Sequence, residues 1–460
     1  MSSPVADSSQ VPSCPAHDLI PLYGPEFAAN PGKVYDELRR RYGQIAPVEL
    51  EPGISAMLVV GYDAALRILH DPETFPKDPR RWQGSVPPDS PLLPVMAYRP
   101  NCVYTVGAEH ARLRSVVADS MARVDLYALR VEVERAADSL ISRFSSAGEV
   151  ELVSQYAATL PILVLNYLFG CPPSFEDRLV AGCRIVLGAD YGEDSEKGNA
   201  DLTQCVTELV AHKRSQPGAD VISWMAAHPV GLASEELVHQ VILLIAGTLE
   251  PEKSLIANAL RLLLADDRFA GNLSSGSLPI EDAIDEVLWS DAPISNFGIT
   301  YPRRNLDFYG VRLPADQPVV LSFAGANTDP SVHNDSRGGN RAHLAWSAGP
   351  HSCLAQEAAR LIASVAIEKL LDRLPDLELA VPADELVWAP NPFFRTLERL
   401  PVRFPPVSVP LARQDNGRPE VEERPDAADR PLSVPVAARM GTRRQAKRWW
   451  TSLANWWDGR

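Results

Sequence analysis

Several features that would point to familiar classes of protein are absent from this chain of 460 residues. It has no G-x-G-x-x-G motif, no G-x-x-x-x-G-K-[ST] motif and no alternating rhythm of strands and helices, so nucleotide-binding α/β folds are poorly supported. Its longest apolar stretches, 160–169 and 241–247, fall far short of the roughly 20 residues that span a bilayer. The N-terminus has no positive flank followed by an apolar run. We therefore expect a cytoplasmic protein.

Cysteine is scarce and scattered. The six cysteines stand at positions 14, 102, 171, 183, 205 and 353, without a C-x-x-C spacing. In a chain of this length such a distribution indicates neither a disulfide framework nor a zinc site. We expect five of them to be small buried hydrophobic residues, with Cys353 as the exception.

Positive charge is in deficit, with 44 Lys and Arg against 59 Asp and Glu. Binding to nucleic acid needs clustered basic residues that neutralise phosphates, so we expect no nucleic-acid partner. Hydrophobic residues make up 45% of the chain, which is ample for a large core. Because no Pro-rich or Gly-rich linker occurs before residue 405, we expect one large domain over 20–404 after a flexible segment over 1–19.

The composition changes after residue 404. Residues 405–440 contain seven prolines among charged residues, which predicts an extended linker. Residues 441–460 combine Arg and Lys with two tryptophan pairs, 449–450 and 456–457. This pattern predicts an amphipathic tail that contacts a membrane surface or a protein partner. If the tail contacts a membrane, the protein would be peripheral to it. The alternative is a disordered end that happens to contain tryptophan.

Hydrophobic periodicity predicts a mainly α fold with small β-sheets. The expected helices lie around 34–38, at 64–70 with Asp63 as N-cap, and over 109–144, 160–169, 238–264 and 281–289. The helix over 238–264 should be interrupted near Pro251, because proline lacks a backbone donor. The expected strands lie at 56–60 and in a pair within 311–323 that turns at 314–316.

The strongest chemical signal lies in residues 343–373, HLAWSAGPHSCLAQEAARLIASVAIEKLLDR. A glycine-containing loop brings Cys353 to the start of an amphipathic helix. The positive end of the helix dipole and free backbone N–H groups favour a thiolate, which is the form that ligates a metal. On these residues alone, an inert cysteine at a helix start is the more common interpretation, and metal ligation is the alternative.

The same loop resembles the haem-ligand signature of cytochromes P450, in which an aromatic residue is followed by glycine three residues later and cysteine four after that. Here these residues are Trp346, Gly349 and Cys353, and His351 occupies a position where a basic residue usually contacts a haem propionate. Trp346 replaces the usual phenylalanine and Ala355 the usual glycine. The resemblance implies the cytochrome P450 fold and haem b with the Cys353 thiolate as axial ligand.

The resemblance covers roughly residues 20–404. Residues 107–114 resemble the family's helix in which a histidine and an arginine four residues apart bind a propionate. His110 and Arg114 would share one helix face, as a two-point clamp on a carboxylate requires. The alternative is a solvated basic face.

The activity that the resemblance implies is that of a haem-thiolate monooxygenase. A thiolate ligand favours cleavage of the O–O bond, and one oxygen atom of O2 would enter an apolar small-molecule substrate. Electrons would come from a ferredoxin-type donor and its reductase.

Two arginines that the family usually carries are missing. Its Glu-x-x-Arg pair becomes Glu286-x-x-Trp289, a pattern shared with a bacterial subgroup of the family. A buried Glu286 would then need another partner. Thr300 occupies the strand position that commonly supplies an arginine to the second propionate, with Arg303 and Arg304 close by.

The long helix also departs from the family, which places an acid and then a threonine beside bound oxygen. Glu250 aligns with the acid, Glu252 replaces the threonine, and Thr248 and Ser254 are nearby hydroxyls. Protons could be routed through Glu250, Glu252 and water, or both glutamates could be solvated at a helix break. Two further functions stay open: a catalytically impaired haem protein that interacts or senses through its tail, and a peroxide-driven oxygenase.

Overall fold

The computed structural model describes residues 19–88, 90, 92–186, 195–266, 280–332 and 340–407. The predicted flexible segment 1–19, apart from its last residue, lies outside the described residues. So do 408–440 of the predicted linker and the whole predicted tail, 441–460. No helix of the described part is long and apolar enough to cross a membrane.

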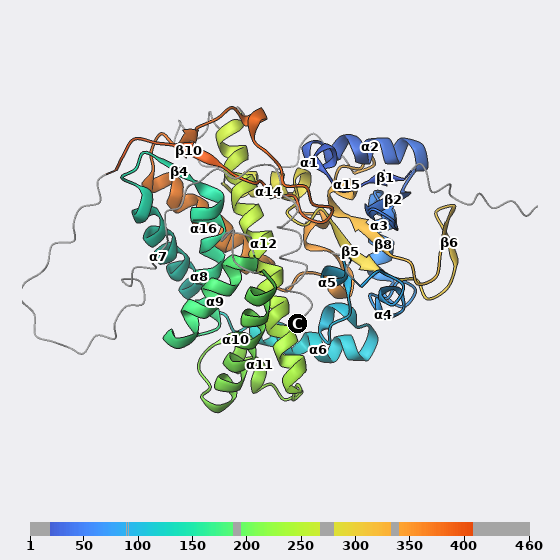
Figure 1. Cartoon of the computed structure of the whole chain (residues 1–460), viewed down its shortest axis with the longest axis horizontal. Helices are drawn as coiled ribbons and strands as arrows, with labels where there is room; N and C mark the ends of the chain where they lie inside the picture. The colour runs from blue at the N-terminus through green and yellow to red at the C-terminus, as the bar shows by residue number, and fades with distance from the viewer. Residues whose placement is uncertain are drawn as a thin grey trace, which may run out of the picture.

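The prediction of a mainly α fold with small sheets is confirmed. The long helix α12 (Ser234–Ala265) runs through the middle of the molecule, with a helical half on one side and the main sheet on the other (Figure 1). The helical half contains α7 (Leu126–Phe144), α8 (Thr159–Leu168), α14 (Ile280–Ser290) and α16 (Gln356–Arg373). Their apolar faces form one buried cluster with the C-terminal part of α12.

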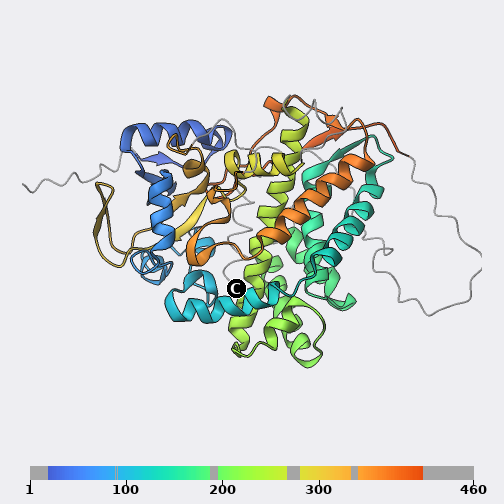
Figure 2. The same ribbon diagram turned by 180° about the vertical axis from the view of Figure 1, so that it is seen from behind.

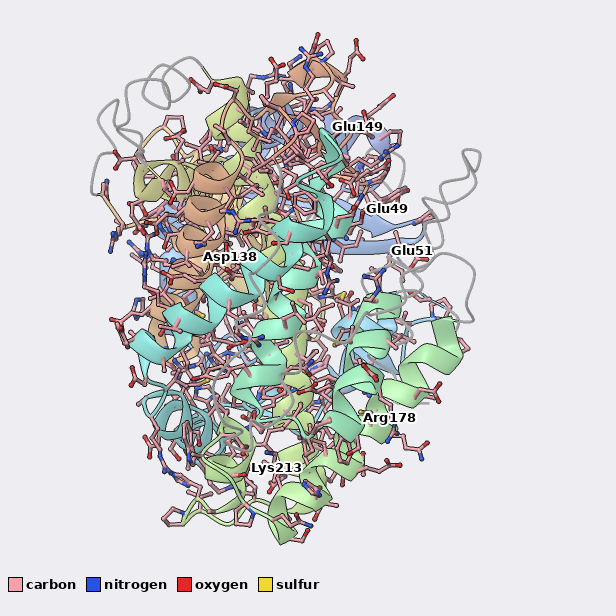
Figure 3. All side chains as sticks on the ribbon, turned by 90° about the vertical axis from the view of Figure 1, so that its left-hand side faces the viewer. Glu49, Glu51, Asp138, Glu149, Arg178 and Lys213 are labelled. Carbon is pink, nitrogen blue, oxygen red and sulfur yellow. The ribbon has the colours of Figure 1, made fainter. Side chains whose placement is uncertain are left out.

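Helices α7 and α16 lie side by side at the outer edge of this half. The Asp138 carboxylate on α7 forms salt bridges with two cations of α16. Its oxygens lie 2.9 Å from Nζ of Lys369 and 2.6 Å from Nη1 of Arg373 (Figure 3). This anchors the helix that follows the cysteine loop.

A second apolar cluster fills the other end of the helical half. It is built by α9 (Pro173–Val186), α10 (Ser195–Ser215) and α11 (Val221–Ala226) against the N-terminal part of α12. Lys213 at the end of α10 is buried and bonds to Asp220, the N-cap of α11, at 2.7 Å. Figure 3 shows Lys213 and Arg178 at this end of the molecule.

The main sheet has five strands in the order β1-β2-β3-β8-β5. They are β1 (Ile20–Pro21), β2 (Ile45–Glu51), β3 (Ile54–Val59), β8 (Val319–Ser322) and β5 (Asn296–Thr300). Strands β2 and β3 are antiparallel, β3 and β8 are parallel with Met57 opposite Val319, and β5 and β8 are antiparallel. Helices α1 (Pro25–Ala29), α2 (Pro31–Tyr42) and α3 (Tyr62–His70) surround this sheet (Figure 1).

The remaining elements are short. Strands β4 (Glu149–Glu151), β10 (Pro401–Arg403) and β9 (Glu378–Leu379) form a second sheet, and β6 (Leu306–Phe308) pairs with β7 (Val311–Leu313). The other helices are α4 (Arg80–Gln83), α5 (Leu93–Met96), α6 (Gly107–Met121) and α15 (Phe323–Asn327). Single turns occur at η1 (Cys102–Tyr104), η2 (Val153–Ala157), η3 (Leu344–Trp346), η4 (Gly349–His351) and η5 (Ala383–Glu385).

The predicted interruption of the long helix is wrong, because α12 continues through Pro251. Proline cannot donate to the carbonyl four residues before it, which is that of Gly247. Burial against neighbouring helices along most of α12 keeps the helix together despite this lost bond.

Three local predictions also differ from the structure. The helix expected over 109–144 is two helices, since Asp125 caps the start of α7 and accepts from the Tyr127 amide at 2.8 Å. Asp63 does not cap α3; it lies in the first turn and contacts the Tyr309 hydroxyl. The two strands within 311–323 exist but do not pair with each other, because β8 is inserted between β3 and β5.

Candidate functional site

The cysteine loop approaches the main-sheet half so closely that one of its residues must lack a side chain. Gly349 has φ +66°, and a Cβ atom there would collide with the backbone carbonyl of Leu69 at the end of α3. The loop also closes on itself, since the Cys353 amide donates to the carbonyl of Trp346 at 2.9 Å. The Trp346 ring packs against the core of the helical half. These contacts fix where the thiol lies.

Cys353 lies three residues before the first residue of α16, and its Sγ accepts from the Ala355 amide at 3.4 Å. The thiol is partly exposed, whereas the other four cysteines of the described residues are buried, as predicted for them. Burial raises the pKa of the Cys353 thiol, and the Ala355 amide and the Arg114 cation oppose this increase. The Ala355 amide at the start of the helix thus favours the thiolate, as expected, but desolvation has a larger and opposite effect on the thiol pKa.

Helix α6 contributes His110 and Arg114, which both contact the cysteine loop, as their spacing predicted. Figure 2 shows the segment before α16 lying beside α6. The Arg114 Nη2 donates to the Ser352 carbonyl at 2.6 Å. The His110 nitrogens lie 2.8 Å from the Cys102 carbonyl and 3.0 Å from the Pro350 carbonyl. His110 is buried, which rules out the alternative of a solvated basic face.

His351 lies against His110, with ring centroids 4.0 Å apart. Its Nε2 is 3.1 Å from the Thr105 carbonyl. Burial lowers the pKa of His351 to about 3, and the charge of Lys77 contributes to this decrease. A neutral ring donates through only one nitrogen, so the Thr105 carbonyl selects the tautomer with the proton on Nε2.

Lys77 is a residue of this region that sequence analysis missed. It lies between α3 and α4 and is only 8% exposed. Burial lowers its pKa to about 8. Within the described part of the chain no carboxylate forms an ion pair with it, since its neighbour Asp78 bonds to Arg80 at 2.7 Å. A buried cation without an ion pair is uncommon enough to require an explanation.

Helix α12 carries the two glutamates, and the alternative in which both are solvated is wrong, because both are buried. Glu250 is buried and bonds to Lys253 at 2.7 Å, with the Ser254 hydroxyl 3.3 Å away. Glu252 is 4% exposed, and its Oε1 has no hydrogen-bond partner among the described residues. Burial raises the pKa of Glu252 well above its usual range, so it is the protonated form that is favoured. The charge of Glu252 also acts on Cys353.

Thr248 has a local role in the same helix. Its hydroxyl donates to the Leu244 carbonyl, one turn earlier, at 2.8 Å. The hydroxyl is thereby engaged by the backbone of its own helix. Among the three α12 residues predicted to be catalytic, Thr248 and Glu250 have partners within the helix, and Glu252 alone has an unsatisfied oxygen.

The missing arginines are compensated in two different places. Glu286 is only partly buried, and the buried carboxylate is its neighbour Asp285, which Arg360 of α16 binds at 2.5 Å. The Trp289 indole donates to the Asn340 carbonyl at 2.8 Å and so connects α14 to the segment before the cysteine loop.

At the other position, Thr300 is buried and donates to the Val319 carbonyl of β8 at 3.3 Å. Arg303 and Arg304 are exposed. The next residue, Tyr301, donates its amide to the Pro76 carbonyl at 2.7 Å, which brings the end of β5 beside Lys77. The neighbourhood that lacks an arginine therefore contains a buried lysine.

No protein-family model matches the chain. A relative among characterised proteins is the cytochrome P450 monooxygenase PikC of Streptomyces venezuelae, which is 32% identical over 406 residues, 85% of this chain and 95% of PikC. The chain belongs to the cytochrome P450 family. Vitamin D(3) 25-hydroxylase of Pseudonocardia autotrophica is 28% identical over 85% of this chain and 98% of its own length.

Solved structures of cytochromes P450 have the same fold. CYP154A1 from Streptomyces coelicolor superposes with a TM-score of 0.72 at 28% identity, covering 84% of this chain and 100% of its own. CYP154C4 from Streptomyces sp. W2061 gives 0.73 at 27% identity, covering 84% and 97%. Cytochromes P450 use haem b with a cysteine thiolate as axial ligand.

The residues around Cys353 fit this cofactor. Haem b carries two carboxylates. The region of the cysteine loop contains cations and hydrogen-bond donors that suit them: Lys77, His110, Arg114 and His351. Among the described residues, no carboxylate forms an ion pair with Lys77. Cys353 is partly exposed, whereas the other cysteines of the described residues are buried. The unsatisfied Oε1 of Glu252 indicates that a further polar group belongs beside α12.

Proposed function

We propose that this cytochrome P450 is a monooxygenase that inserts one atom of O2 into an apolar small molecule, with electrons from a ferredoxin-type protein and its reductase. The observation that carries the proposal is Cys353, a partly exposed residue whose Sγ accepts from the Ala355 amide in a loop that Arg114 of α6 contacts. We also assign the chain to the family members with a Glu-x-x-Trp pattern, on the basis of Glu286 and Trp289.

In this proposal Cys353 is the axial ligand of haem b. The bound haem supplies the activation of O2, which the thiolate promotes by favouring O–O cleavage. The Ala355 amide stabilises negative charge on Sγ, and Arg114 adds a nearby positive charge. Both effects oppose the desolvation that raises the thiol pKa. His110, Arg114 and His351 would hold the haem carboxylates, and Trp346 and Gly349 shape the loop.

Glu252 is the residue we assign to proton delivery. It is a buried acid whose protonated form is favoured, so it has a proton to donate. Its charge also influences the pKa of Cys353. Glu250 supports it from within the helix, because its charge is fixed by Lys253. The Thr248 hydroxyl is engaged by Leu244, and it can join a relay only by giving up that bond.

The proposed substrate class follows from the relatives. Their names include a vitamin D(3) 25-hydroxylase, a 2-hydroxy-5-methyl-1-naphthoate 7-hydroxylase and a 6-deoxyerythronolide B hydroxylase, and one solved relative is described in complex with myristic acid. All of these are largely apolar molecules. We therefore propose an apolar small molecule for this chain as well.

Peroxide-driven oxygenation is a second candidate, and Glu252 is the observation that favours it. Peroxide already carries the two electrons that O2 takes from a donor, so this route needs only proton transfer, which a buried acid would provide. Turnover of a test substrate with peroxide alone, compared with turnover by O2, a ferredoxin and its reductase, separates the two. Activity in the first system that Glu252→Gln abolishes would favour the peroxide route.

The test of the proposal is the absorption spectrum of the reduced protein under carbon monoxide, with a haem assay. We expect the red-shifted band of a thiolate-ligated haem in the wild type and its loss in Cys353→Ala. Cys102→Ala is the matched control, because Cys102 is buried and the pKa of its thiol is raised by burial to about 11. Retention of the shifted band in Cys353→Ala would show that another residue is the ligand.

A further inference from the structure

Lys77 is the feature that the site described so far does not use. Its side chain is buried, and this desolvation lowers its pKa. No carboxylate of the described residues opposes that decrease by pairing with the Lys77 ammonium. Burying a cation without a partner costs free energy, and such residues usually have a ligand to neutralise. The ligand must then be an anion from outside the described chain.

The position of Lys77 follows from one hydrogen bond of its neighbour Pro76 and from its effect on His351. The carbonyl of its neighbour Pro76 accepts from the Tyr301 amide, which fixes the segment at the end of β5. The charge of Lys77 acts on His351, whose ring lies against His110. His351 is in turn two residues from Cys353. Lys77 thus lies on the β5 side of the cysteine loop, and Arg114 reaches the loop from α6.

This arrangement supplies two cations from two different elements around the cysteine loop. Arg114 comes from α6, and Lys77 comes from the segment between α3 and α4. Haem b has two carboxylates on neighbouring edges of its ring, so two separate cations match it better than one. Strand β5 offers no cation here, because Thr300 bonds to β8 and Arg303 and Arg304 are exposed.

We propose that Lys77 binds a carboxylate of the haem and replaces the arginine that β5 lacks. The proposal rests on the proposed function, in which Cys353 ligates that haem. Lys77 is a binding residue for the cofactor and takes no part in oxygen chemistry. Its bond to the haem carboxylate would turn an uncompensated buried charge into an ion pair. The neighbouring carboxylate, Asp78, would remain bound to Arg80.

The experiment measures how fast haem leaves the full-length protein when an excess of haem-free myoglobin captures it. Lys77→Met should lose haem roughly 10- to 100-fold faster than wild type, the range for one hydrogen bond to a charged group. Lys77→Arg keeps the charge and should stay closer to wild type. Lys33→Met, which removes an exposed lysine of α2, is the matched control and should not change the rate.

A second measurement uses protein loaded with haem dimethyl ester, whose carboxylates are blocked. Wild type and Lys77→Met should then release the cofactor at similar rates, because the partner of Lys77 is gone. Faster release from Lys77→Met with both cofactors would overturn the proposal, since Lys77 would then act on the protein alone. Equal release of native haem by the two proteins would overturn it as well.

The result also separates this inference from the proposed function. A wild type without the thiolate spectrum contradicts the proposed function and, with it, the assignment of Lys77. A wild type with that spectrum and no ester-dependent effect of Lys77→Met contradicts the assignment of Lys77 only. If Lys77→Met takes up no native haem, Lys77→Gln, which keeps a polar side chain, replaces it in the same comparison. Failure of both to take up either cofactor would also overturn the proposal, because the defect would not depend on the carboxylates.

Discussion

The two sides of the candidate site differ in how fully their polar groups are bonded. On the cysteine-loop side, each polar side chain contacts a backbone carbonyl. His110 contacts that of Pro350, Arg114 that of Ser352, and His351 that of Thr105. On the α12 side, Glu252 has a buried oxygen without a partner among the described residues. The first side is held by the fold itself. On the second side, burying the Glu252 carboxyl group costs folding free energy that no hydrogen bond to its Oε1 offsets among the described residues. Such a buried acid is typical of a functional residue.

Within α12 the same contrast separates two glutamates that are two residues apart. Glu250 belongs to a closed network with Lys253 and Ser254, whereas Glu252 has no comparable network. We therefore expect substitutions of Glu250 to change stability and substitutions of Glu252 to change chemistry. The following predictions test this difference and the corresponding stability of the loop side.

The largest effect should come from Glu250→Ala. It removes one partner of an ion pair whose side chains are 2% and 6% exposed, and leaves the Lys253 ammonium buried. Breaking such a pair costs about 3–5 kcal/mol of unfolding free energy. Urea unfolding followed by circular dichroism would measure it.

The matched control replaces the pair as a whole. Glu250→Met with Lys253→Met leaves no buried charge and should recover most of the lost stability. A double variant as unstable as Glu250→Ala would indicate that the glutamate acts through contacts other than this pair.

Arg114→Ala should have the next largest effect, on the cysteine-loop side. The variant loses a charged hydrogen bond of 2.6 Å to the Ser352 carbonyl, which is worth about 1.5–3 kcal/mol. We expect lower haem content and faster haem release, measured by absorbance. Arg112→Ala is the control on the same helix, because Arg112 binds Glu109 and Glu236 at the surface. Equal haem retention in both variants would show that the α6 clamp is unnecessary.

How much could be predicted from the sequence depended on whether the signal was local. The cysteine loop was placed well, because Trp346, Gly349 and Cys353 lie within eight residues and their spacing carries the geometry. The parallel pairing of β8 with β3 was not, since it joins segments more than 200 residues apart. Local turn signals favour a hairpin and contain no information about a distant partner.

Burial was the other quantity that the sequence did not supply. The break expected at Pro251 implied solvated glutamates, but tertiary packing keeps α12 continuous and buries both. Lys77 was missed for the same reason, because an isolated lysine in a loop gives no sign of burial. Asp285, with Arg360 on a helix 75 residues later, could not be distinguished from Glu286 by pattern alone.

Glu252→Gln should have a smaller effect on stability, with a defined pH dependence. Burial raises the pKa of Glu252 in the folded protein, so the wild type loses stability as pH rises above the ordinary carboxyl range. Glutamine does not titrate, and the stability of the variant relative to wild type should therefore increase with pH, by at most about 1.4 kcal/mol per pH unit. Thermal unfolding from pH 5 to pH 8 would measure this. A constant difference would show that burial does not raise the pKa of Glu252 in the folded protein.

The smallest expected effect is that of Trp289→Phe, which tests the substitute for the family's missing arginine. Phenylalanine keeps much of the edge-on packing against His343, where the ring centroids are 5.7 Å apart, but it cannot donate to the Asn340 carbonyl. We expect a loss of about 1 kcal/mol in unfolding free energy. Because Asn340 lies in the segment that leads to the cysteine loop, haem release should also become slightly faster. If stability falls while haem release is unchanged, the bond serves α14 alone, and the loop is positioned by its contacts with α3 and α6.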